Sequence, residues 1–147
     1  EPTTDHMTLF SFSKDAQEDY FRARITSGGG NDGNLTLLID DDTSTTQDIL
    51  TSVDLKPYGD SSNLKTIAIV NDHINQKTII YTEDGTNEVA SFRDDTISNS
   101  EFIFGATKLN PGFIYQGFVG SLQGLAIYDE AVSASNVSLI INKFKTL

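Results

Sequence analysis

Short segments in which apolar and polar residues alternate recur along most of this chain, and this pattern limits the possible folds more than any other feature of the sequence. In the clearest segment, residues 19–26 (DYFRARIT), Phe21, Ala23 and Ile25 alternate with polar or charged neighbours. Successive side chains of a β-strand point to opposite faces, so this alternation indicates a strand with one apolar and one polar face. Several such segments between turn signals indicate an all-β fold.

Turn signals separate the predicted strands. The glycine-rich residues 27–34 (SGGGNDGN) indicate a turn or loop, and Asp84-Gly85 indicate a hairpin turn, because both residue types tolerate the positive φ angles of such turns. The polar residues 41–63 are expected to connect two strands. The strands themselves are expected at residues 7–12, 19–26, 35–40, 64–70, 77–82, 88–92, 101–108 and 120–129.

One helix is expected, near the C-terminal end of the sequence. It spans residues 133–144, where Ser133 is a candidate N-cap and four apolar residues recur at helical spacing: Val137, Ile140, Ile141 and Phe144. Eight or nine strands with one short helix predict an all-β, two-sheet antiparallel sandwich or barrel. Because the chain has 147 residues and no repeat or linker, we expect a single domain over residues 1–147.

Charge and composition exclude several classes of partner. Ten basic and 21 acidic residues give a net charge of −11, which repels the phosphates of nucleic acids and anionic lipid headgroups. No apolar run approaches the roughly 18 residues of a membrane-spanning helix, so we expect no nucleic-acid partner and no membrane insertion. The chain has no cysteine, which excludes disulfides and thiol nucleophiles and fits an exported bacterial protein. We therefore expect a secreted or cell-surface location.

The sequence contains no recognisable catalytic constellation. His6 and His73 lie in unrelated polar contexts, and no nucleophile elbow, zinc-binding histidine pair or phosphate-binding loop is present. Two carboxylates could align on a sheet rich in Asp and Glu, as in glycoside hydrolases, but the chain has no tryptophan to stack a sugar beside them. We expect that this chain by itself is not an enzyme and has no catalytic residues.

The acidic run Asp40-Asp41-Asp42 has two interpretations. Clustered carboxylates can bind Ca²⁺, which prefers oxygen ligands. Alternatively, the run is a solvated strand end that discourages edge-to-edge association of sheets. The spacing does not match a calcium-binding loop of the EF-hand type, which favours the second interpretation. We expect no metal site and no cofactor, with Ca²⁺ left open as the alternative.

Three longer blocks of the sequence resemble a known family. They are MTLFSFSKDAQEDYFRARI, TIIYTEDGTNEVASF and FIFGATKLNPGFIYQGFVGSLQGLAIYDEAVSASNV. These blocks are similar to the family 40 carbohydrate-binding modules, the lectin-like, sialic-acid-binding modules of bacterial sialidases, within the concanavalin A-like and laminin G-like group. The resemblance implies a two-sheet jelly roll. Family members have further strands before the first block, so the resemblance implies either that these N-terminal strands are lacking here or that another segment or chain completes the sheet edge. We therefore expect the chain to be part of a larger polypeptide or complex.

The resemblance further implies where a sugar would bind. In the family, a Glu-x-Arg pair on a concave strand, a second arginine and a tyrosine hold the sialic acid. In this sequence the corresponding positions are Leu38, Asp40, Leu109 and Tyr115, so only the tyrosine is kept. The positive charge that a carboxylate ligand requires must therefore come from elsewhere.

Two arginines on the polar face of the preceding strand are the candidates for this charge. Arg22 and Arg24 carry planar guanidinium groups that bind a carboxylate through two parallel hydrogen bonds, and Lys108 would assist them. The alternative is that both arginines pair with surface acids and bind nothing. The expected ligand-binding residues are Tyr20, Arg22, Arg24, Asp40, Lys108 and Tyr115.

These observations predict a non-catalytic carbohydrate-binding module. Its ligand would be a sialylated or other host glycan, and it would serve a secreted or surface bacterial protein, attached to a sialidase or another glycoside hydrolase. The alternative is a laminin G-like protein-interaction or structural domain of an adhesin that has lost sugar binding.

Overall fold

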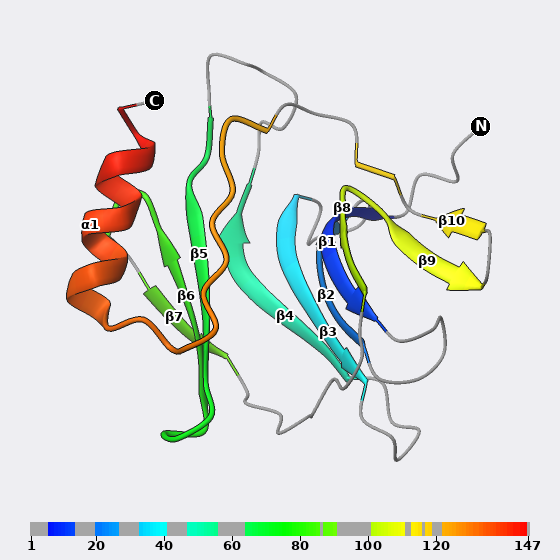
Figure 1. Ribbon diagram of the computed structural model, residues 1–147, viewed down its shortest axis with the longest axis horizontal. Coiled ribbons are helices and arrows are strands. Elements are labelled where there is room, and N and C mark those ends of the chain that lie inside the picture. Colours follow the sequence, from blue (N-terminus) through cyan, green and yellow to red (C-terminus); the bar gives the residue numbers. More distant parts are fainter. Residues whose placement is uncertain are drawn as a thin grey trace. The chain divides into compact units, whose positions relative to one another are not determined.

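The computed structural model describes most of the chain, namely residues 6–13, 20–26, 33–40, 47–55, 64–85, 87–90, 101–110, 113–115, 117–118 and 122–146. This part is mostly β-strand with one short helix near the C-terminal end, as the sequence predicts (Figure 1). The chain divides into two compact units, which are described separately: residues 1–58 with 93–119, and residues 59–92 with 120–147. No described helix is long and apolar enough to cross a membrane.

A five-stranded antiparallel sheet forms the first unit, and its strands lie in the order β4-β3-β2-β1-β8. These strands are β1 (His6–Ser13), β2 (Tyr20–Thr26), β3 (Asn34–Asp40), β4 (Gln47–Asp54) and β8 (Glu101–Phe104). The middle strand, β2, pairs with β3 in continuous register. The position of β2 matters because it carries both candidate arginines.

One face of this sheet is apolar. Phe21, Ala23 and Ile25 share a face of β2, as predicted, and Ala23 and Ile25 are buried. Aromatic rings continue this face toward the sheet edge, where the ring centroids of Phe12 and Phe102 lie 4.9 Å apart. Burial of this layer removes apolar surface from water, which is the main stabilising contribution to such a sheet.

Strand β4 lies within residues 41–63, where the sequence predicted only a polar connection, so that prediction is wrong. The register between β3 and β4 is interrupted near Asn34. Here the Thr51 hydroxyl donates a hydrogen bond of 2.7 Å to the Leu35 carbonyl and accepts one of 3.2 Å from the Val53 N–H. A side chain therefore replaces part of the backbone ladder, and the regular alternation that identifies a strand is lost.

The predicted strand 101–108 is broken into two. Gly105 has φ +74°, which side-chain-bearing residues rarely adopt, and this residue turns the chain out of the sheet. Its N–H donates to the Leu9 carbonyl at 2.8 Å, and its own carbonyl accepts from the Phe118 N–H at 2.7 Å. The chain then continues as a two-stranded hairpin of β9 (Thr107–Asn110) and β10 (Phe113–Tyr115).

The second unit contains a three-stranded antiparallel sheet in the order β5-β6-β7. Its strands are β5 (Ile67–Asp72), β6 (Lys77–Thr82) and β7 (Asn87–Ala90). The predicted hairpin turn at Asp84-Gly85 is confirmed, because Gly85 has φ +85° and donates its N–H to the Thr82 carbonyl at 3.1 Å.

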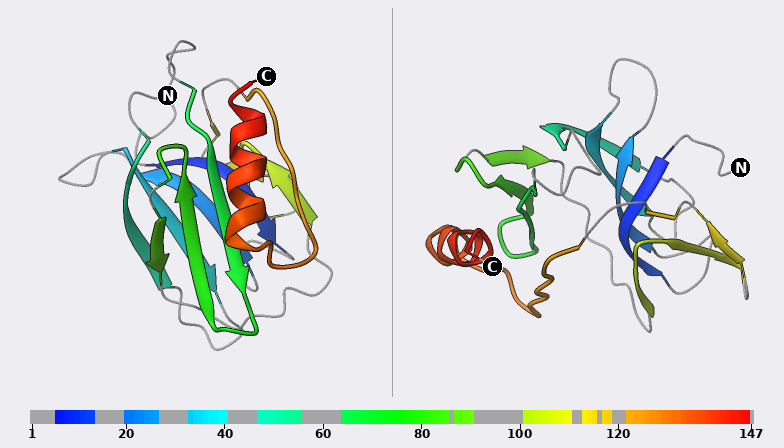
Figure 2. Two further views of the ribbon diagram at one scale, coloured as in Figure 1. Left: turned by 90° about the vertical axis from the view of Figure 1, so that its left-hand side faces the viewer. Right: turned by 90° about the horizontal axis from the view of Figure 1, so that it is seen from above.

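Helix α1 (Ala134–Phe144) lies against this sheet (Figure 2). The predicted helix and its N-cap position, Ser133, are both confirmed, although the Ser133 side chain makes no capping hydrogen bond. Val137 and Ile141 form the buried face of the helix, as their spacing predicts, and they pack with Val70 of β5. Three partly buried residues complete this small core: Ala68, Tyr81 and Val132.

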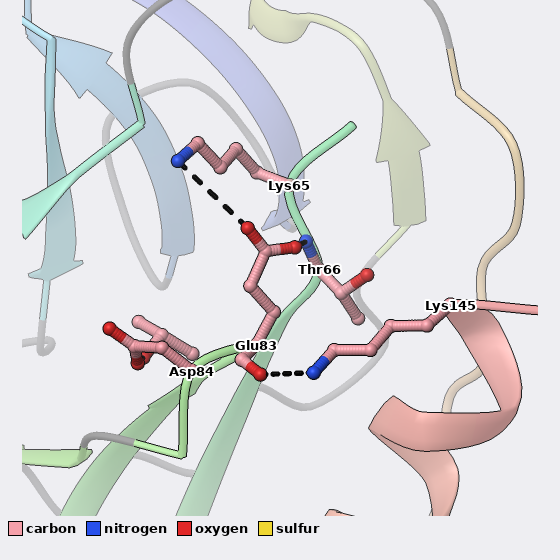
Figure 3. Close-up of polar contacts among 6 residues, drawn as sticks. Lys65, Thr66, Glu83, Asp84 and Lys145 are labelled. Atoms are coloured by element: carbon pink, nitrogen blue, oxygen red, sulfur yellow. Dashed lines mark hydrogen bonds and ion pairs between the residues drawn. The ribbon is translucent and has the colours of Figure 1, made fainter. Parts of the chain in front are cut away.

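A group of polar contacts ties the C-terminal end of α1 to the strands (Figure 3). The Glu83 carboxylate accepts a hydrogen bond of 3.2 Å from the Thr66 N–H and lies 3.9 Å from the Lys65 ammonium group. The carbonyl of Glu83 accepts a hydrogen bond from the Lys145 side chain. One residue after β6 thus holds both the chain that enters β5 and the end of the helix.

The predicted strand 120–129 is not formed. Its described residues, from 122 onward, belong to no strand of the described chain and run as an elongated stretch toward α1 (Figure 1). A strand-like sequence becomes a strand only when its backbone finds a partner, and none of the described strands pairs with this segment.

Candidate functional site

The face of β2 opposite its apolar face carries the two candidate arginines. Arg22 and Arg24 alternate with Ala23, so they lie on one side of the middle strand of the sheet. The register places residues of β1 and β3 directly beside them on the same side. We call this surface the arginine face; its described residues are Thr8, Ser11, Arg22, Arg24, Thr36 and Leu38.

A β-bulge in β1 gives the arginine face its composition. Between Thr8 and Phe10 the register with β2 shifts, so that Leu9 is an extra residue. Because of this extra residue, Thr8 lies opposite Arg24 and Ser11 lies opposite Arg22, although the two hydroxyl residues are three positions apart. Each arginine therefore has a hydroxyl side chain as its direct cross-strand neighbour on β1.

Both arginines are buried, which differs from the sequence-based expectation of an exposed polar surface. Arg22 is only 6% exposed and Arg24 only 9%, and the neighbouring Thr8 and Ser11 are fully buried. Each arginine takes part in polar or electrostatic interactions. Interactions of a guanidinium group are stronger in a buried setting than in water, but the group also loses its hydration there. Contact with a ligand and pairing with acids of the protein therefore both stay predictions for these buried side chains.

The chain segment after β8 covers part of this face. The Ser11 hydroxyl donates a buried hydrogen bond of 3.1 Å to the Ala106 carbonyl, and strand β9, which begins at the next residue, contacts β1. Ser11 lies directly opposite Arg22. The turn at Gly105 thus directs the β9–β10 hairpin from the sheet edge to the side of the sheet that bears the arginines.

The arginine face borders an exposed residue on β4. Arg24 lies in a row of cross-strand neighbours that runs from Thr8 through Arg24 and Thr36 to Leu50 of β4. Thr8 is fully buried, whereas Leu50 at the other end is 48% exposed. Thr36 and Thr26 share a hydroxyl–hydroxyl hydrogen bond of 2.6 Å beside this row. The row is therefore buried from Thr8 to Thr36, which is 2% exposed, and becomes exposed only at Leu50 of β4; Arg24 lies one residue inside this exposed end, behind Thr36.

The other four predicted site residues are placed by their backbone positions alone. Tyr20 and Asp40 are direct cross-strand partners, and the alternation of β2 and β3 assigns both positions to the arginine face. Tyr115 pairs with Thr107, the residue after Ala106, whereas Lys108 pairs with Ile114. Lys108 and Tyr115 therefore occupy opposite faces of the hairpin and do not share one surface.

Sequence reasoning missed the hydroxyl residues of this face. Thr8, Ser11 and Thr36 become neighbours of the arginines only through the register of three strands, and the bulge at Leu9 shifts that register. The signal in the sequence was the polar residue on alternate positions of each strand, but alternation alone does not show which residue of one strand lies opposite which residue of the next.

The described residues include no group of three or more histidine, aspartate or glutamate side chains that could hold a metal ion. The alternative of a Ca²⁺ site at Asp40-Asp41-Asp42 stays a prediction, because Asp41 and Asp42 lie outside the described residues. The groups that the arginine face offers for binding are the two guanidinium groups and the neighbouring hydroxyl groups.

Comparison with known proteins does not identify a family for this chain. Neither a family model nor a curated protein nor a solved structure matches the chain. The resemblance to the sialidase-associated modules stays a hypothesis, and the function has to be argued from the residues of the site.

Proposed function

We propose that this chain is a non-catalytic carbohydrate-binding module of a secreted or cell-surface bacterial protein, with a two-sheet jelly-roll fold. Its ligand is a glycan that carries a carboxylate, such as a sialylated host glycan. The observation that supports this proposal is the pair of arginines on one side of the middle strand, framed by the hydroxyl groups of Thr8, Ser11 and Thr36. Guanidinium groups bind a carboxylate, and hydroxyl groups exchange hydrogen bonds with sugar hydroxyls.

Arg24 is the residue that we expect to contact the ligand first. It is in the row that ends at the exposed Leu50, while Arg22 has the covered Ser11 as its neighbour. A ligand that approaches from β4 passes Thr36 before it reaches the Arg24 guanidinium group. Tyr20, Asp40 and Tyr115 would complete the binding surface, whereas Lys108, at a position on the other face of the hairpin, would not contact the same ligand.

One observation favours a second candidate function. Both arginines are buried, and each already takes part in interactions within the protein. In a laminin G-like protein-interaction or structural domain, such arginines would hold the sheet and the segment at Ala106 together and would not meet a ligand. The two candidates differ in whether a soluble glycan binds at all.

A glycan array followed by calorimetric titration distinguishes the two functions. We expect binding to sialylated glycans that falls at least about tenfold in Arg24→Lys, since the variant keeps the charge but loses the fork that donates two hydrogen bonds, and a hydrogen bond to a charged group contributes roughly 1.5–3 kcal/mol. Tyr115→Ala should also weaken binding. Lys77→Ala, at an exposed position of the second unit, is the control and should bind like the parent.

Thermal unfolding of each variant separates loss of the site from loss of the fold. Binding lost by a variant that unfolds at the parent temperature supports the proposal. An array with no bound glycan for the folded parent would refute it and favour the protein-interaction domain.

A further inference from the structure

The segment before α1, residues 122–128, has the sequence pattern of a strand but is exposed at the surface. Residues 122–128 (LQGLAIY) were predicted as part of a strand, yet they pair with none of the strands in the described chain. Four large side chains of this segment are between 46% and 55% exposed: Leu122, Leu125, Ile127 and Tyr128. Contiguous exposed apolar residues on a soluble protein usually mark an interaction surface, and an unpaired extended backbone is a template for a further strand.

We propose that this segment pairs with the same segment of a second copy of the chain, in antiparallel orientation about a two-fold axis at Leu125. A homodimer interface of this kind uses one surface twice, so the segment must be complementary to itself. The charge distribution supports this occupant. Residues 122–128 carry no charge, and the acids Asp129 and Glu130 follow at one end only.

Antiparallel pairing keeps the acidic ends of the two copies apart. With Leu125 on the axis, Asp129 of one copy lies opposite Ser121 of the other, and the two Asp129 residues are separated by the length of eight strand residues. That length is about 27 Å at ~3.4 Å per residue. It exceeds the Debye length of about 8 Å at physiological salt, so the repulsion between the acidic ends is screened. Parallel pairing would instead place both acids beside their copies at about 5 Å.

The same register matches the side chains. Leu122 of one copy lies opposite Tyr128 of the other, Gly124 lies opposite Ala126, and the two Leu125 residues face each other across the axis. Aliphatic–aromatic cross-strand pairs stabilise a sheet, and the small pair leaves room for the large side chains beside it. Ile127 of one copy lies opposite Gln123 of the other. Three of the four exposed apolar residues, Leu122, Leu125 and Tyr128, thus obtain apolar partners from an identical segment.

The total charge of the chain gives this interface a recognisable salt dependence. Each copy carries a net charge of −11, so association must overcome general repulsion between the two copies. Added salt screens this repulsion and should strengthen the dimer. A basic partner protein at the same surface would be released by salt, so the direction of the effect separates the two occupants.

Analytical ultracentrifugation of the chain over a range of protein and salt concentrations tests the proposal. We expect a monomer–dimer equilibrium that shifts toward the dimer at higher salt. Leu125→Asp places two like charges opposite each other at the axis and should raise the dissociation constant at least about tenfold. Leu139→Asp is the matched control, because Leu139 lies on α1, is 67% exposed and receives the same new charge; its dissociation constant should not change.

A single cysteine tests the register. The chain has no cysteine, so Leu125→Cys creates one thiol per copy, and the two thiols meet at the proposed axis. Mild oxidation should link this variant into a dimer much faster than Leu139→Cys, with circular dichroism confirming that both are folded. A chain that stays monomeric at millimolar concentration in high salt would overturn the proposal, and so would equal cross-linking of the two variants.

Discussion

The two units bury different kinds of side chain against their sheets. In the second unit, α1 meets β5 with apolar residues, among them Val137 and Ile141, while the contacts of Glu83 lie at partly exposed ends. In the first unit, the middle strand buries Arg22 and Arg24 beside hydroxyl groups. An apolar residue is stabilised by burial without any particular partner, whereas a guanidinium group loses hydration that its new contacts must offset. The packing of α1 is thus explained by folding alone, whereas the arginine face requires a further reason.

The largest effect that we expect comes from the apolar contact of the second unit. Ile141→Ala should lower the free energy of unfolding by about 2–5 kcal/mol, because it removes buried methyl groups and leaves a cavity beside Val70. Leu139→Ala on the exposed side of the same helix should change it by less than about 0.5 kcal/mol. Denaturant unfolding followed by circular dichroism measures both. Equal losses in the two variants would show that α1 is not held by its apolar face.

Substitutions of Arg22 on the arginine face should change the free energy of unfolding in a different way. Two variants separate the effect of side-chain charge from the effect of side-chain volume. Arg22→Met keeps much of the side-chain volume and should cost about 2 kcal/mol, because it removes the guanidinium group from the interactions that it makes within the protein. Arg22→Ala should cost about 1 kcal/mol more through the cavity. Lys143→Met, at an exposed position of α1, is the control and should be nearly neutral. The same unfolding experiment applies. A stable Arg22→Met variant would mean that the arginine contributes nothing to the fold, and its burial would then have to serve the ligand.

Local patterns were enough to predict most elements of both units. The alternation around Ala23 identified β2, and the positive φ that Gly85 tolerates identified the turn after β6. The spacing of Val137 and Ile141 identified the buried face of α1. Each of these features depends on residues within one turn or one strand, so the chain itself carries the information.

The features that the sequence did not reveal depend on distant residues. Strand β4 was missed because Thr51 replaces part of its backbone ladder to β3, which breaks the alternation. The burial of the arginines could not be foreseen, because the segment that meets this side of the sheet, through the hydrogen bond between Ala106 and Ser11, lies far along the chain. The segment before α1 was predicted as a strand from its pattern, but a pattern does not supply the partner strand. The register of a strand, the burial of its side chains and its pairing partner are all determined by tertiary structure. The candidate site depends on the register and burial of several strands.

The smallest effect concerns a charge in the second unit that, unlike the arginines, is only partly buried. The side-chain amide of Asn75, which donates to the Asp72 carboxylate at 2.7 Å, and then the Asn75 backbone N–H at 3.0 Å, hold the pKa of Asp72 below its ordinary value. Because the folded pKa is lowered, these hydrogen bonds stabilise the β5–β6 turn at pH values above the pKa of the unfolded chain, and the stabilisation is lost as the pH falls through the folded pKa.

Asn75→Ala removes the amide donor but keeps the backbone N–H, so the pKa of Asp72 should rise toward its ordinary value without reaching it. Titration of the Asp72 carboxyl by nuclear magnetic resonance measures this shift in parent and variant, and Ile74→Ala, which changes a neighbouring exposed side chain of the same turn, is the control. The difference in free energy of unfolding between the parent and Asn75→Ala should shrink in acid, where the Asp72 carboxyl group is protonated in both proteins. An identical Asp72 titration in all three proteins would show that water, and not Asn75, satisfies this partly buried charge. The contrast with the buried guanidinium groups would then be sharper than the contacts of Asn75 suggest.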